Sequence, residues 1–497
     1  MKLKELLKDI KILESNVDMD TDIGAVAYDS RKVTPGSAFV AITGFASDGN
    51  RFIPMALEKG AAVVVTAQKP LENIPYVLVE SDRLALALLG CNFYGHPAKA
   101  MTMVGVTGTN GKTSVTLLLK HVLEKTLGAK VGLIGTTANM IGDEIIPTER
   151  TTPESFELQG LFARMRDAGC THVVMEVSSH AIALDRVAGV RFDAAAFTNL
   201  TEDHLDFHKT MDHYCDTKAE LFRRCANGVI NADDSYAPRF LEAADCRVLT
   251  TSVAGEAGLQ AKNLELRADG IDFAAVLNGA EVPVSLGIPG KFTVYNALSV
   301  LGLAVSLGIE LSDAAKALAD APGVKGRVEV VPTPGTDYTV LIDYAHTPDG
   351  LENVLSAVRG FCKGRLIAVF GCGGDRDPIK RPIMGQIGAR LADIAIITSD
   401  NPRTEDPEAI IADITPGAEK AGKPYEVVVD RIAAIRHAMA LAEKDDIIVL
   451  AGKGHETTQE IRGVFYPLDE RKIVAECFPI RSKLREDRTG NLPSLSV

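Results

Sequence analysis

The chain has no apolar stretch long enough to cross a membrane. None of its hydrophobic runs approaches the roughly 18 uninterrupted apolar residues that a membrane helix needs. Residues 1–7 read as a short amphipathic helix and lack the long apolar core of a signal peptide. We therefore expect a cytoplasmic protein that does not insert into a membrane.

Cysteine pairs with metal-binding or redox spacing are also missing. The chain of 497 residues contains eight cysteines, and none of them stands in a CxxC pair. Such usage suits reduced thiols in a cytoplasm. Cys372 lies in a glycine-rich segment, where packing as a small residue is its expected role.

An excess of positive charge is absent as well. The net charge is −13 and the isoelectric point is near 5.4, which argues against nucleic acid as a partner. Local cationic loops can still bind small anionic ligands. Internal repeats and low-complexity tracts are missing, and only residues 487–497 are expected to be disordered.

The strongest pattern that the chain does contain is a strand leading into a phosphate-binding loop. Residues 101–106 are apolar or β-branched, and residues 114–127 have apolar side chains at helical spacing. A glycine is expected five residues before Gly111, but Val106 occupies that position and Gly105 lies one residue too early. A glycine-rich turn with a chance Lys-Thr pair is the alternative. The predicted phosphate-binding residues are Gly108, Thr109, Asn110, Gly111, Lys112, Thr113 and Ser114.

The length predicts three domains, because one core does not grow to this size. Breaks at residues 94–97 and 332–335 suggest domains at 1–97, 98–330 and 331–497. The expected fold class is α/β, with a central P-loop domain built on a parallel sheet and a Rossmann-like C-terminal domain. Buried strands are expected at 38–42, 61–65, 171–177, 339–343, 366–370, 394–398 and 447–450.

Polar side chains follow the apolar runs of the central segment. In an open parallel sheet, ligands bind at the carboxyl ends of the strands. Glu176 ends one such run and is placed to hold magnesium beside a phosphate loop. His204 follows the next run and could bind a metal or orient a nucleophile; a hydrogen-bonded helix-cap histidine is the alternative.

Three apolar runs of the third segment also lead into charged loops. Residues 366–370, 394–398 and 447–450 precede loops that contain two arginines, a lysine and several acids. One such loop would indicate only a solvated turn. Three at adjacent strand ends predict a clamp for a zwitterionic substrate.

The chain resembles the Mur ligases, ATP-dependent enzymes that form amide bonds in peptidoglycan precursor synthesis. The motifs that carry the resemblance are TGTNGKT, EVSSH, NLTEDHLD, DYAHTP and AGKGHE, which begin at residues 107, 176, 199, 343 and 451. Asp29, Ser30 and Arg31, followed by residues 35–36 and 39–41, look like the branch that adds the third residue of the stem peptide. The resemblance covers essentially the whole chain.

The resemblance implies that the three domains bind UDP, ATP and an amino acid. Asn296 would contact adenine, Arg327 the triphosphate and Asp343 the ribose. Leu184 stands where relatives often carry glutamine, so a hydrogen bond to substrate is expected to be absent or supplied otherwise. The UDP-linked muramoyl dipeptide would be bound by Ser30, Phe45, Ala46, Ser47, Thr151, Thr152, Ser178 and Arg186.

Lys218 stands where these ligases carry a carbamylated lysine, a change that turns a cation into an anion able to bridge a second magnesium. From the sequence alone, a solvated helix lysine is the simpler interpretation. The resemblance implies ATP and Mg²⁺ as cofactors and a catalytic set of Lys112, Glu176, His204 and Lys218. The implied metal ligands are Thr113, Glu176, His204 and carbamylated Lys218.

The run from Asp400 to Arg403 indicates which amino acid is added. An arginine closes this motif in relatives that add meso-diaminopimelate, whose extra carboxylate matches the two parallel donors of a guanidinium. The same arginine would repel the ammonium end of lysine. The implied site comprises Arg376, Asp400, Asn401, Pro402, Arg403, Gly452 and Glu456, with Glu456 suited to an ammonium group.

The implied reaction joins meso-diaminopimelate to UDP-N-acetylmuramoyl-L-alanyl-D-glutamate through an acyl phosphate and releases ADP and phosphate. A monomer is expected, and three sites on three domains predict domain closure on binding. The alternatives are the same reaction with L-lysine, a folylpolyglutamate-type ligase, and a nucleotide-binding regulatory module without chemistry.

Overall fold

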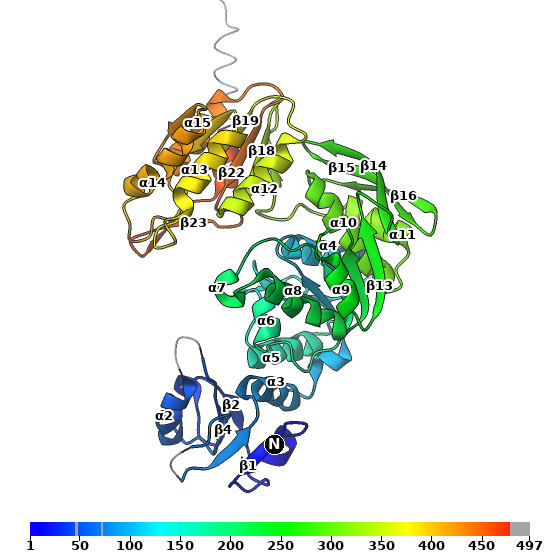
Figure 1. The fold of residues 1–497 in the computed structure, drawn as a ribbon, viewed down its shortest axis with the longest axis vertical. Coiled ribbons are helices and arrows are strands. Elements are labelled where there is room, and N and C mark those ends of the chain that lie inside the picture. Colours follow the sequence, from blue (N-terminus) through cyan, green and yellow to red (C-terminus); the bar gives the residue numbers. More distant parts are fainter. Residues whose placement is uncertain (45–47, 71–72, 149, 478–497) are drawn as a thin grey trace, which may run out of the picture. The chain divides into compact units, whose positions relative to one another are not determined.

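The computed structural model describes residues 1–44, 48–70, 73–148 and 150–477 (Figure 1). Three predicted UDP contacts, at residues 45–47, and the tail predicted to be disordered lie outside these ranges. The chain divides into two compact units. The first comprises Met1–Gln260, Val276–Ala280 and Tyr295–Ala317, and the second Ala261–Ala275, Glu281–Val294 and Leu318–Val497. The domain boundaries near residues 97 and 330 stay predictions.

The N-terminal part of the first unit is built on a five-stranded sheet of order β1-β5-β4-β3-β2. All residues of β3 are buried, with Ala38 and Val40 facing one core and Phe39 and Ala41 the other. The strands are β1 (Ile12–Ser15), β2 (Ala25–Ala27), β3 (Ser37–Ala41), β4 (Val63–Thr66) and β5 (Tyr76–Val79). The helices are α1 (Leu3–Leu6), η1 (Ser30–Lys32), η2 (Gly49–Phe52), α2 (Ile53–Glu58), α3 (Asp82–Phe93) and η3 (Pro97–Ala100).

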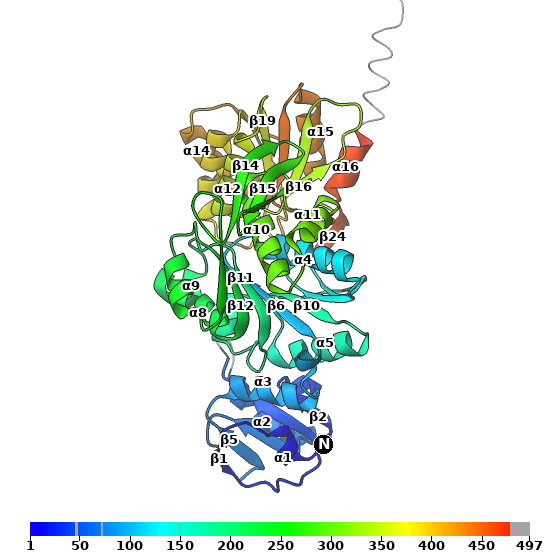
Figure 2. The same ribbon diagram turned by 90° about the vertical axis from the view of Figure 1, so that its right-hand side faces the viewer.

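The central part carries a parallel sheet in which β6 lies between β10 and β11, as Figure 2 shows. Val104 of β6 pairs with Val174 of β10 and Ala194 of β11, so these strands end at the same edge. Antiparallel strands β8 and β9 extend the sheet beyond β7. The strands are β6 (Thr102–Thr107), β7 (Val131–Ile134), β8 (Asn139–Ile141), β9 (Glu144–Ile146), β10 (His172–Glu176), β11 (Phe192–Phe197), β12 (Cys225–Asn231) and β13 (Arg247–Ser252).

Helices cover both faces of this sheet. One core joins the strands to α5, α6, α8 and α9, whereas Gly302 of α10 lies against Val229 on the opposite face of β12. The helices are α4 (Lys112–Leu127), α5 (Ser155–Asp167), α6 (Ser179–Ala183), α7 (Leu205–His208), α8 (Met211–Ala219), η4 (Glu220–Arg223), α9 (Ala237–Ala243), α10 (Lys291–Ser306) and α11 (Leu311–Ala319). Three strands, β14 (Leu259–Arg267), β15 (Gly270–Leu277) and β16 (Ala280–Leu286), fall largely in the second unit.

The C-terminal sheet has the order β17-β18-β22-β19-β20-β21, and β18 to β22 run parallel. Ala368 and Phe370 of β19 face a core with α12, α13 and α14, while Ile367 and Val369 face α15 and α16. Burial on both faces explains the continuous apolar runs. The strands are β17 (Glu329–Val331), β18 (Thr339–Asp343), β19 (Leu366–Phe370), β20 (Ile394–Ile397), β21 (Tyr425–Val427), β22 (Ile447–Ala451), β23 (Thr458–Ile461) and β24 (Val464–Pro467).

The helices of this part are α12 (Pro348–Arg359), α13 (Lys380–Leu391), α14 (Pro407–Lys420), α15 (Arg431–Leu441) and α16 (Glu470–Glu476). Cys372 packs as predicted, with its Sγ 3.6 Å from the sulfur of Met384, and all eight cysteines are free thiols. In the described part of the chain, every helix is too short or too polar to span a bilayer. The predicted α/β class is confirmed.

The irregular glycine of the phosphate-loop motif has a packing role. Gly105 lies within β6, where an added Cβ would stand 3.1 Å from the Phe192 ring and 3.2 Å from Val177. Such contacts are tighter than a packed core accepts without movement. Gly105 therefore lets the central strand approach its covering side chains and takes no part in the turn.

We expect Gly105→Ala to lower the free energy of unfolding by about 1–3 kcal/mol, because the added methyl group overpacks the core. Urea denaturation of the variant and the parent protein measures the difference. Gly24→Ala is the matched control, since a Cβ there meets no atom within 4 Å. Equal unfolding midpoints for Gly105→Ala and the parent would contradict this packing role.

Candidate active site

The loop between β6 and α4 turns on two glycines. Gly108 has φ +144° and Gly111 has φ +84°, conformations that favour glycine. A side chain on Gly108 would collide with the Thr198 hydroxyl, and one on Gly111 with the amide oxygen of Asn296. The chain enters α4 at Lys112, so the backbone N–H groups of the first helical turn form a site for an anion.

The next loop residues are fastened to the segment that follows β11. The N–H of Thr109 donates to the Asn199 carbonyl at 2.8 Å, and the N–H of Asn110 donates to the Asn199 side chain at 2.9 Å. The Thr109 hydroxyl donates to the carbonyl of Thr201 at 3.2 Å. Ser114 is half-buried in the first turn of α4. All seven predicted phosphate-loop residues thus lie together at one strand end.

Glu176 ends β10 beside this loop and is buried. Its carboxylate accepts hydrogen bonds from the Thr113 hydroxyl at 2.9 Å and from the Thr136 N–H and hydroxyl at 2.9 and 3.0 Å. Gly135 makes room for it, because a Cβ there would stand 2.6 Å from the carboxylate. Hydroxyl and carboxylate oxygens of this kind suit Mg²⁺, so Thr113 and Glu176 fit the predicted metal.

Two lysines converge on one backbone carbonyl. Lys112 Nζ donates to the carbonyls of Gly108 and Thr109 at 3.0 and 2.8 Å, and Lys218 Nζ donates to Gly108 at 2.8 Å. Lys218 is fully buried in α8 and lies 4.7 Å from the centre of the Tyr214 ring. Burial, and then the charge of Lys112, hold the pKa of Lys218 well below its ordinary value. The predicted solvated lysine is therefore wrong as a description of its surroundings.

His204 stands at the start of α7 with φ +55° and a half-exposed side chain. Its Nε2 lies 3.4 Å from Asp203 Oδ2, and its ring centre lies 4.9 Å from that of His180. Its side chain makes no capping hydrogen bond to α7, which does not match the helix-cap alternative. Among the described residues, no group of three or more His, Cys, Asp or Glu side chains is arranged to hold a metal ion.

A second histidine, one helical turn after His204, is not among the residues predicted from the sequence. His208 is buried, its Nε2 lies 2.8 Å from the Ser179 hydroxyl, and its Nδ1 lies 3.2 Å from Nδ1 of His213. Burial, and then the neighbouring His180, lower the pKa of His208 to about 4. A neutral His208 thus ties α7 to α6 and α8, and its spacing from His204 is the signal that could have revealed it.

Four of the residues predicted to contact the dipeptide lie in a cluster next to Glu176. The Thr152 hydroxyl donates to the Glu176 carbonyl at 2.8 Å, and the Ser178 N–H donates to the Thr152 hydroxyl at 3.2 Å. Thr151 lies 3.0 Å from the Thr136 hydroxyl, and Arg186 Nη1 donates to the Thr152 carbonyl at 3.2 Å. Leu184, the predicted departure from the family pattern, is buried at the end of α6. Ser30 lies apart from these residues, in η1, with its hydroxyl 3.3 Å from the Met55 sulfur.

Three arginines surround Glu154, a buried carboxylate next to the dipeptide contacts that is not among the predicted site residues. Glu154 is surrounded by Arg186, Arg83 and Arg150 at 3.3, 3.7 and 3.8 Å. Three guanidinium groups that converge on one carboxylate provide N–H donors that suit an anionic ligand. Arg83 comes from α3, far from Glu154 in the sequence, so sequence spacing gave no signal for this contact.

The remaining predicted nucleotide contacts fall in different units. Asn296 belongs to the first unit, and Arg327 and Asp343 to the second. Asp343 ends β18 and accepts the N–H groups of Val328 and Ala345, each at 2.8 Å. Burial raises the pKa of Asp343, although the Arg327 guanidinium acts in the opposite direction. Arg327 lies 5.3 Å from the centre of the Tyr344 ring.

Two of the three charged loops of the second unit meet through Lys453. This side chain is fully buried and donates to the Asn401 side-chain oxygen and to Glu456, both at 2.9 Å. The amide nitrogen of Asn401 also donates to Glu456 at 2.9 Å. The Glu456 side chain is 29% exposed, and hydrogen bonds from Lys453 and Asn401 hold its carboxylate at the ends of β20 and β22. The loop sequence had suggested Lys453 only as one cation among several.

Gly373 of the third loop lies beside both predicted arginines, Arg376 of the same loop and Arg403 of the loop after β20. A Cβ on this glycine would stand 3.0 Å from Arg403 Nη1 and 3.9 Å from Arg376 Cγ. Arg403 has φ +51°, donates to the Gly374 carbonyl at 2.8 Å and pairs with Glu460 at 3.2 Å. Asp400 and Gly452 lie beneath the same loops, and the Pro402 carbonyl accepts the N–H of Glu405. The structure therefore brings all seven predicted residues of the amino-acid site to neighbouring loops.

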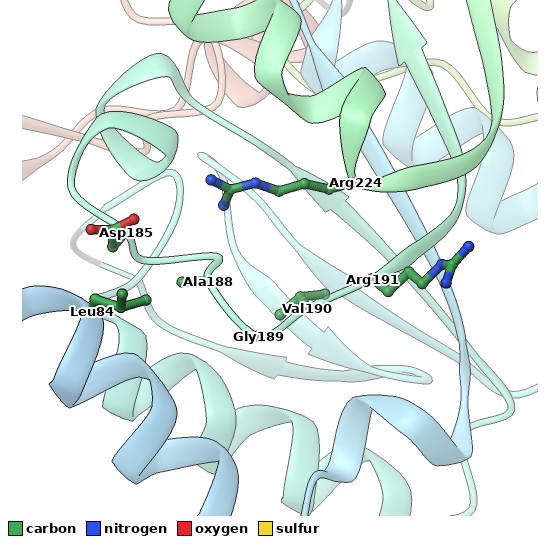
Figure 3. Close-up of a pocket in the computed structure, with 7 residues that line it drawn as sticks. All are labelled: Leu84, Asp185, Ala188, Gly189, Val190, Arg191 and Arg224. Atoms are coloured by element: carbon green, nitrogen blue, oxygen red, sulfur yellow. The ribbon is translucent and has the colours of Figure 1, made fainter. Parts of the chain in front are cut away.

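A hollow of about 540 Å³ lies elsewhere in the first unit, between α3 and the loop after α6 (Figure 3). None of the predicted site residues lines it. Its charged lining side chains are Asp185, Arg191 and Arg224. It is shallow and open, so it does not replace the strand-end loops as the candidate active site.

The chain is similar to known proteins along most of its length. The chain matches the Mur ligase family catalytic domain over residues 22–98, the Mur ligase middle domain over 106–304 and the Mur ligase glutamate ligase domain over 326–454. A ligase of Clostridium botulinum named UDP-N-acetylmuramoyl-L-alanyl-D-glutamate–2,6-diaminopimelate ligase is 49% identical, covering 92% of this chain and 95% of that protein. The ligase of the same name from Caldanaerobacter subterraneus is 48% identical, covering 96% and 98%.

Solved structures give the same result. A structure of a UDP-N-acetylmuramoyl-L-alanyl-D-glutamate–2,6-diaminopimelate ligase is 31% identical with a TM-score of 0.74, covering 97% of this chain and 99% of that one. A MurF ligase from Thermotoga maritima in complex with ADP shares the fold at 20% identity, with a TM-score of 0.59 and coverage of 94% and 99%. The chain therefore belongs to the Mur ligase family.

Proposed function

We propose that the protein is an ATP-dependent ligase that joins meso-diaminopimelate to UDP-N-acetylmuramoyl-L-alanyl-D-glutamate in peptidoglycan precursor synthesis. The observation that carries the proposal is the pair of opposite charges on the amino-acid loops, with Arg376 and Arg403 beside Gly373 and Glu456 on its buried base. Diaminopimelate has one carboxylate more than lysine, and the arginines match it. The names of the related ligases support the same substrate.

The reaction proceeds by acyl activation. The free carboxylate of the D-glutamyl residue attacks the γ-phosphorus of ATP, and ADP leaves with the electrons of the broken P–O bond. The diaminopimelate amine, after losing a proton, attacks the acyl carbon of the resulting acyl phosphate and expels inorganic phosphate. Amide, ADP and phosphate are the products.

The first task of the protein is to bring two anions together. A carboxylate and a triphosphate repel one another, so the encounter needs fixed positive charge and N–H donors. The N–H groups at the start of α4 and the ammonium of Lys112 supply both. Asn296 would hold the adenine, Arg327 the triphosphate and Asp343 the ribose.

Mg²⁺ bound at this site would neutralise phosphate charge. Thr113 and Glu176 would hold it, with His204 and a carbamylated Lys218 as further ligands. Lys218 suits that modification because carbon dioxide reacts with a neutral amine, and burial beside Lys112 favours the neutral form. The carbamate would also replace a buried repulsion between two ammonium groups with an attraction.

The dipeptide substrate would be bound by Ser30, Thr151, Thr152, Ser178 and Arg186. The excess of arginines around Glu154 suits the negative charge of this substrate. We further propose that the enzyme acts as a monomer in the cytoplasm, where eight free thiols stay reduced. Residues 45–47 keep their predicted role in UDP binding.

A coupled phosphate-release assay tests the proposed function. We expect phosphate release to require ATP, the UDP-linked dipeptide and meso-diaminopimelate together, with kcat/KM for L-lysine lower by at least about 100-fold, because lysine lacks the second carboxylate that the arginines would bind. Preference for lysine would overturn the amino-acid assignment. Release with folate and glutamate would indicate a folylpolyglutamate-type ligase, and ATP binding without coupled release a regulatory module.

We expect Arg403→Ala to raise the KM for meso-diaminopimelate by about 10- to 100-fold, the effect of losing a hydrogen bond between charged groups. The KM for ATP should stay within about twofold, because Arg403 lies on the amino-acid loops. Arg390→Ala removes an exposed arginine from the same part of the chain and serves as the control. Equal increases in both KM values for Arg403→Ala would contradict the assignment.

We expect Lys218→Ala and Lys218→Arg to lower kcat by more than about 100-fold, since each removes the group that can become an anion at the phosphate site. Short carboxylic acids should partly restore Lys218→Ala. With ¹³C-labelled carbon dioxide at neutral pH, the parent protein should give a carbamate carbon signal that both variants lack. Full activity of Lys218→Arg would show that a cation suffices there.

A further inference from the structure

The C-terminal part of the chain buries an ion pair that the proposed chemistry does not use. Arg431, the first residue of α15, and Glu470, the first residue of α16, have side chains with 0% exposure. Arg431 Nε donates to Glu470 Oε1 at 2.8 Å. Both charges lie beneath the loops that carry the proposed amino-acid site.

Arg431 connects those two loops directly. Its Nη2 donates to the Ala451 carbonyl at 2.8 Å, and its Nη1 lies 3.5 Å from the Ser399 carbonyl. Ala451 is the last residue of β22, and Ser399 follows the end of β20. β19 lies between these two strands in the sheet. One planar guanidinium therefore links the segments that follow β20 and β22, which carry Arg403 and Glu456.

The side chain of Asp400 completes this buried cluster. One carboxylate oxygen accepts the Asn401 N–H at 2.7 Å, while the other is buried without a hydrogen-bond partner among the described residues. That second oxygen and Arg431 Nη2 both lie near Gly452, where an added Cβ would stand 2.5 and 3.9 Å from them. Gly452 has φ +118°, so the loop passes over the two charges only because it has no side chain there.

A contribution to the stability of the fold is a weak explanation for this pair. A buried ion pair can often be replaced by apolar residues of similar volume without loss of stability, because burial of each charge is costly. Burial indeed raises the pKa of the Glu470 carboxyl, although Arg431 and Lys453 oppose the shift. The two loops need a donor of fixed shape, which an apolar pair cannot provide.

We propose that Arg431 and Glu470 are positioning residues for the amino-acid substrate, with Glu470 orienting the guanidinium that holds the β20 and β22 loops in register. This inference rests on the proposed function, because it takes these loops as the amino-acid site. Neither residue touches substrate. They act through Asp400, Gly452 and the two carbonyls.

The test compares a double variant of Arg431 and Glu470 with a control variant of the Arg365–Asp446 ion pair, which lies at the opposite ends of the strands. Arg431→Met combined with Glu470→Leu removes both charges and keeps an apolar core. Asp446→Asn weakens the buried partner of Arg365, whose N–H and Nε donate to Asp446 at 2.6 and 3.0 Å at the starts of β19 and β22. Steady-state kinetics and urea denaturation are measured for both variants and for Arg431→Lys.

We expect the double variant to raise the KM for the amino acid by at least about tenfold, with the KM for ATP within about twofold, since the loops lose their common donor. Asp446→Asn should lower the unfolding midpoint and leave both KM values within about twofold. Arg431→Lys keeps the charge but not the fork of donors, and should fall between the parent and the double variant. An unchanged amino-acid KM in a folded double variant would overturn the proposal.

Hydrogen exchange separates this outcome from failure of the proposed function. If the parent protein shows no coupled phosphate release, the proposed function fails and kinetics cannot be compared. The amides of Asn401, Arg403 and Glu456 should still exchange faster in the double variant than in Asp446→Asn if Arg431 fixes the loops. Unchanged exchange at these amides in the double variant would overturn the positioning role, even if it unfolds more readily.

Discussion

Two ammonium groups share the carbonyl oxygen of Gly108, and the organisation of the central site follows from that crowding. Like charges that share one hydrogen-bond acceptor repel strongly wherever water is excluded. Lys112 can face a phosphate from the start of α4, but Lys218 is enclosed and loses the charged form first. The same burial that makes a lysine cation unfavourable there makes its amine reactive, so the constraint and the proposed modification have one cause.

The alignment of the strand ends at one edge of each sheet is a second constraint on the structure. Parallel strands end at one edge of the sheet. Glu176 and the loop after β11 therefore lie beside the phosphate loop, although they are far from it in the sequence. The C-terminal sheet repeats the principle with β19, β20 and β22. In each sheet, side chains buried on both faces fix the strands, and the loops at one edge carry the charges.

The sequence patterns predicted what depends on local chemistry. Continuous apolar runs gave the strands at 366–370 and 447–450, because burial on both faces leaves no polar alternation. The motif gave the phosphate loop, but Gly105 could be understood only once Phe192 and Val177 were seen packed against it. Local spacing reports on turns and helices, and says little about which side chains cover a strand.

Long-range pairs could not be read from spacing. Arg431 and Glu470 are 39 residues apart and on different helices, and neither falls in a recognisable motif. Arg83 likewise reaches Glu154 from another part of the unit. The sequence motifs identify Arg403 and Glu456, the partly exposed residues of such a network. They do not identify the buried residues that hold the network in place.

The buried residues beneath the loops would determine which amino acids Arg403 and Glu456 can distinguish. In the proposed amino-acid site Arg403 and Glu456 carry opposite charges, and selectivity between diamino acids would depend on the distance between them as much as on their signs. Glu456 is fixed by Lys453 and Asn401, whereas Arg403 is fixed by Gly374 and Glu460. A site that must distinguish a carboxylate from a hydrogen atom at the end of one side chain therefore needs a rigid base, and buried charges beneath the loops provide one through directed hydrogen bonds.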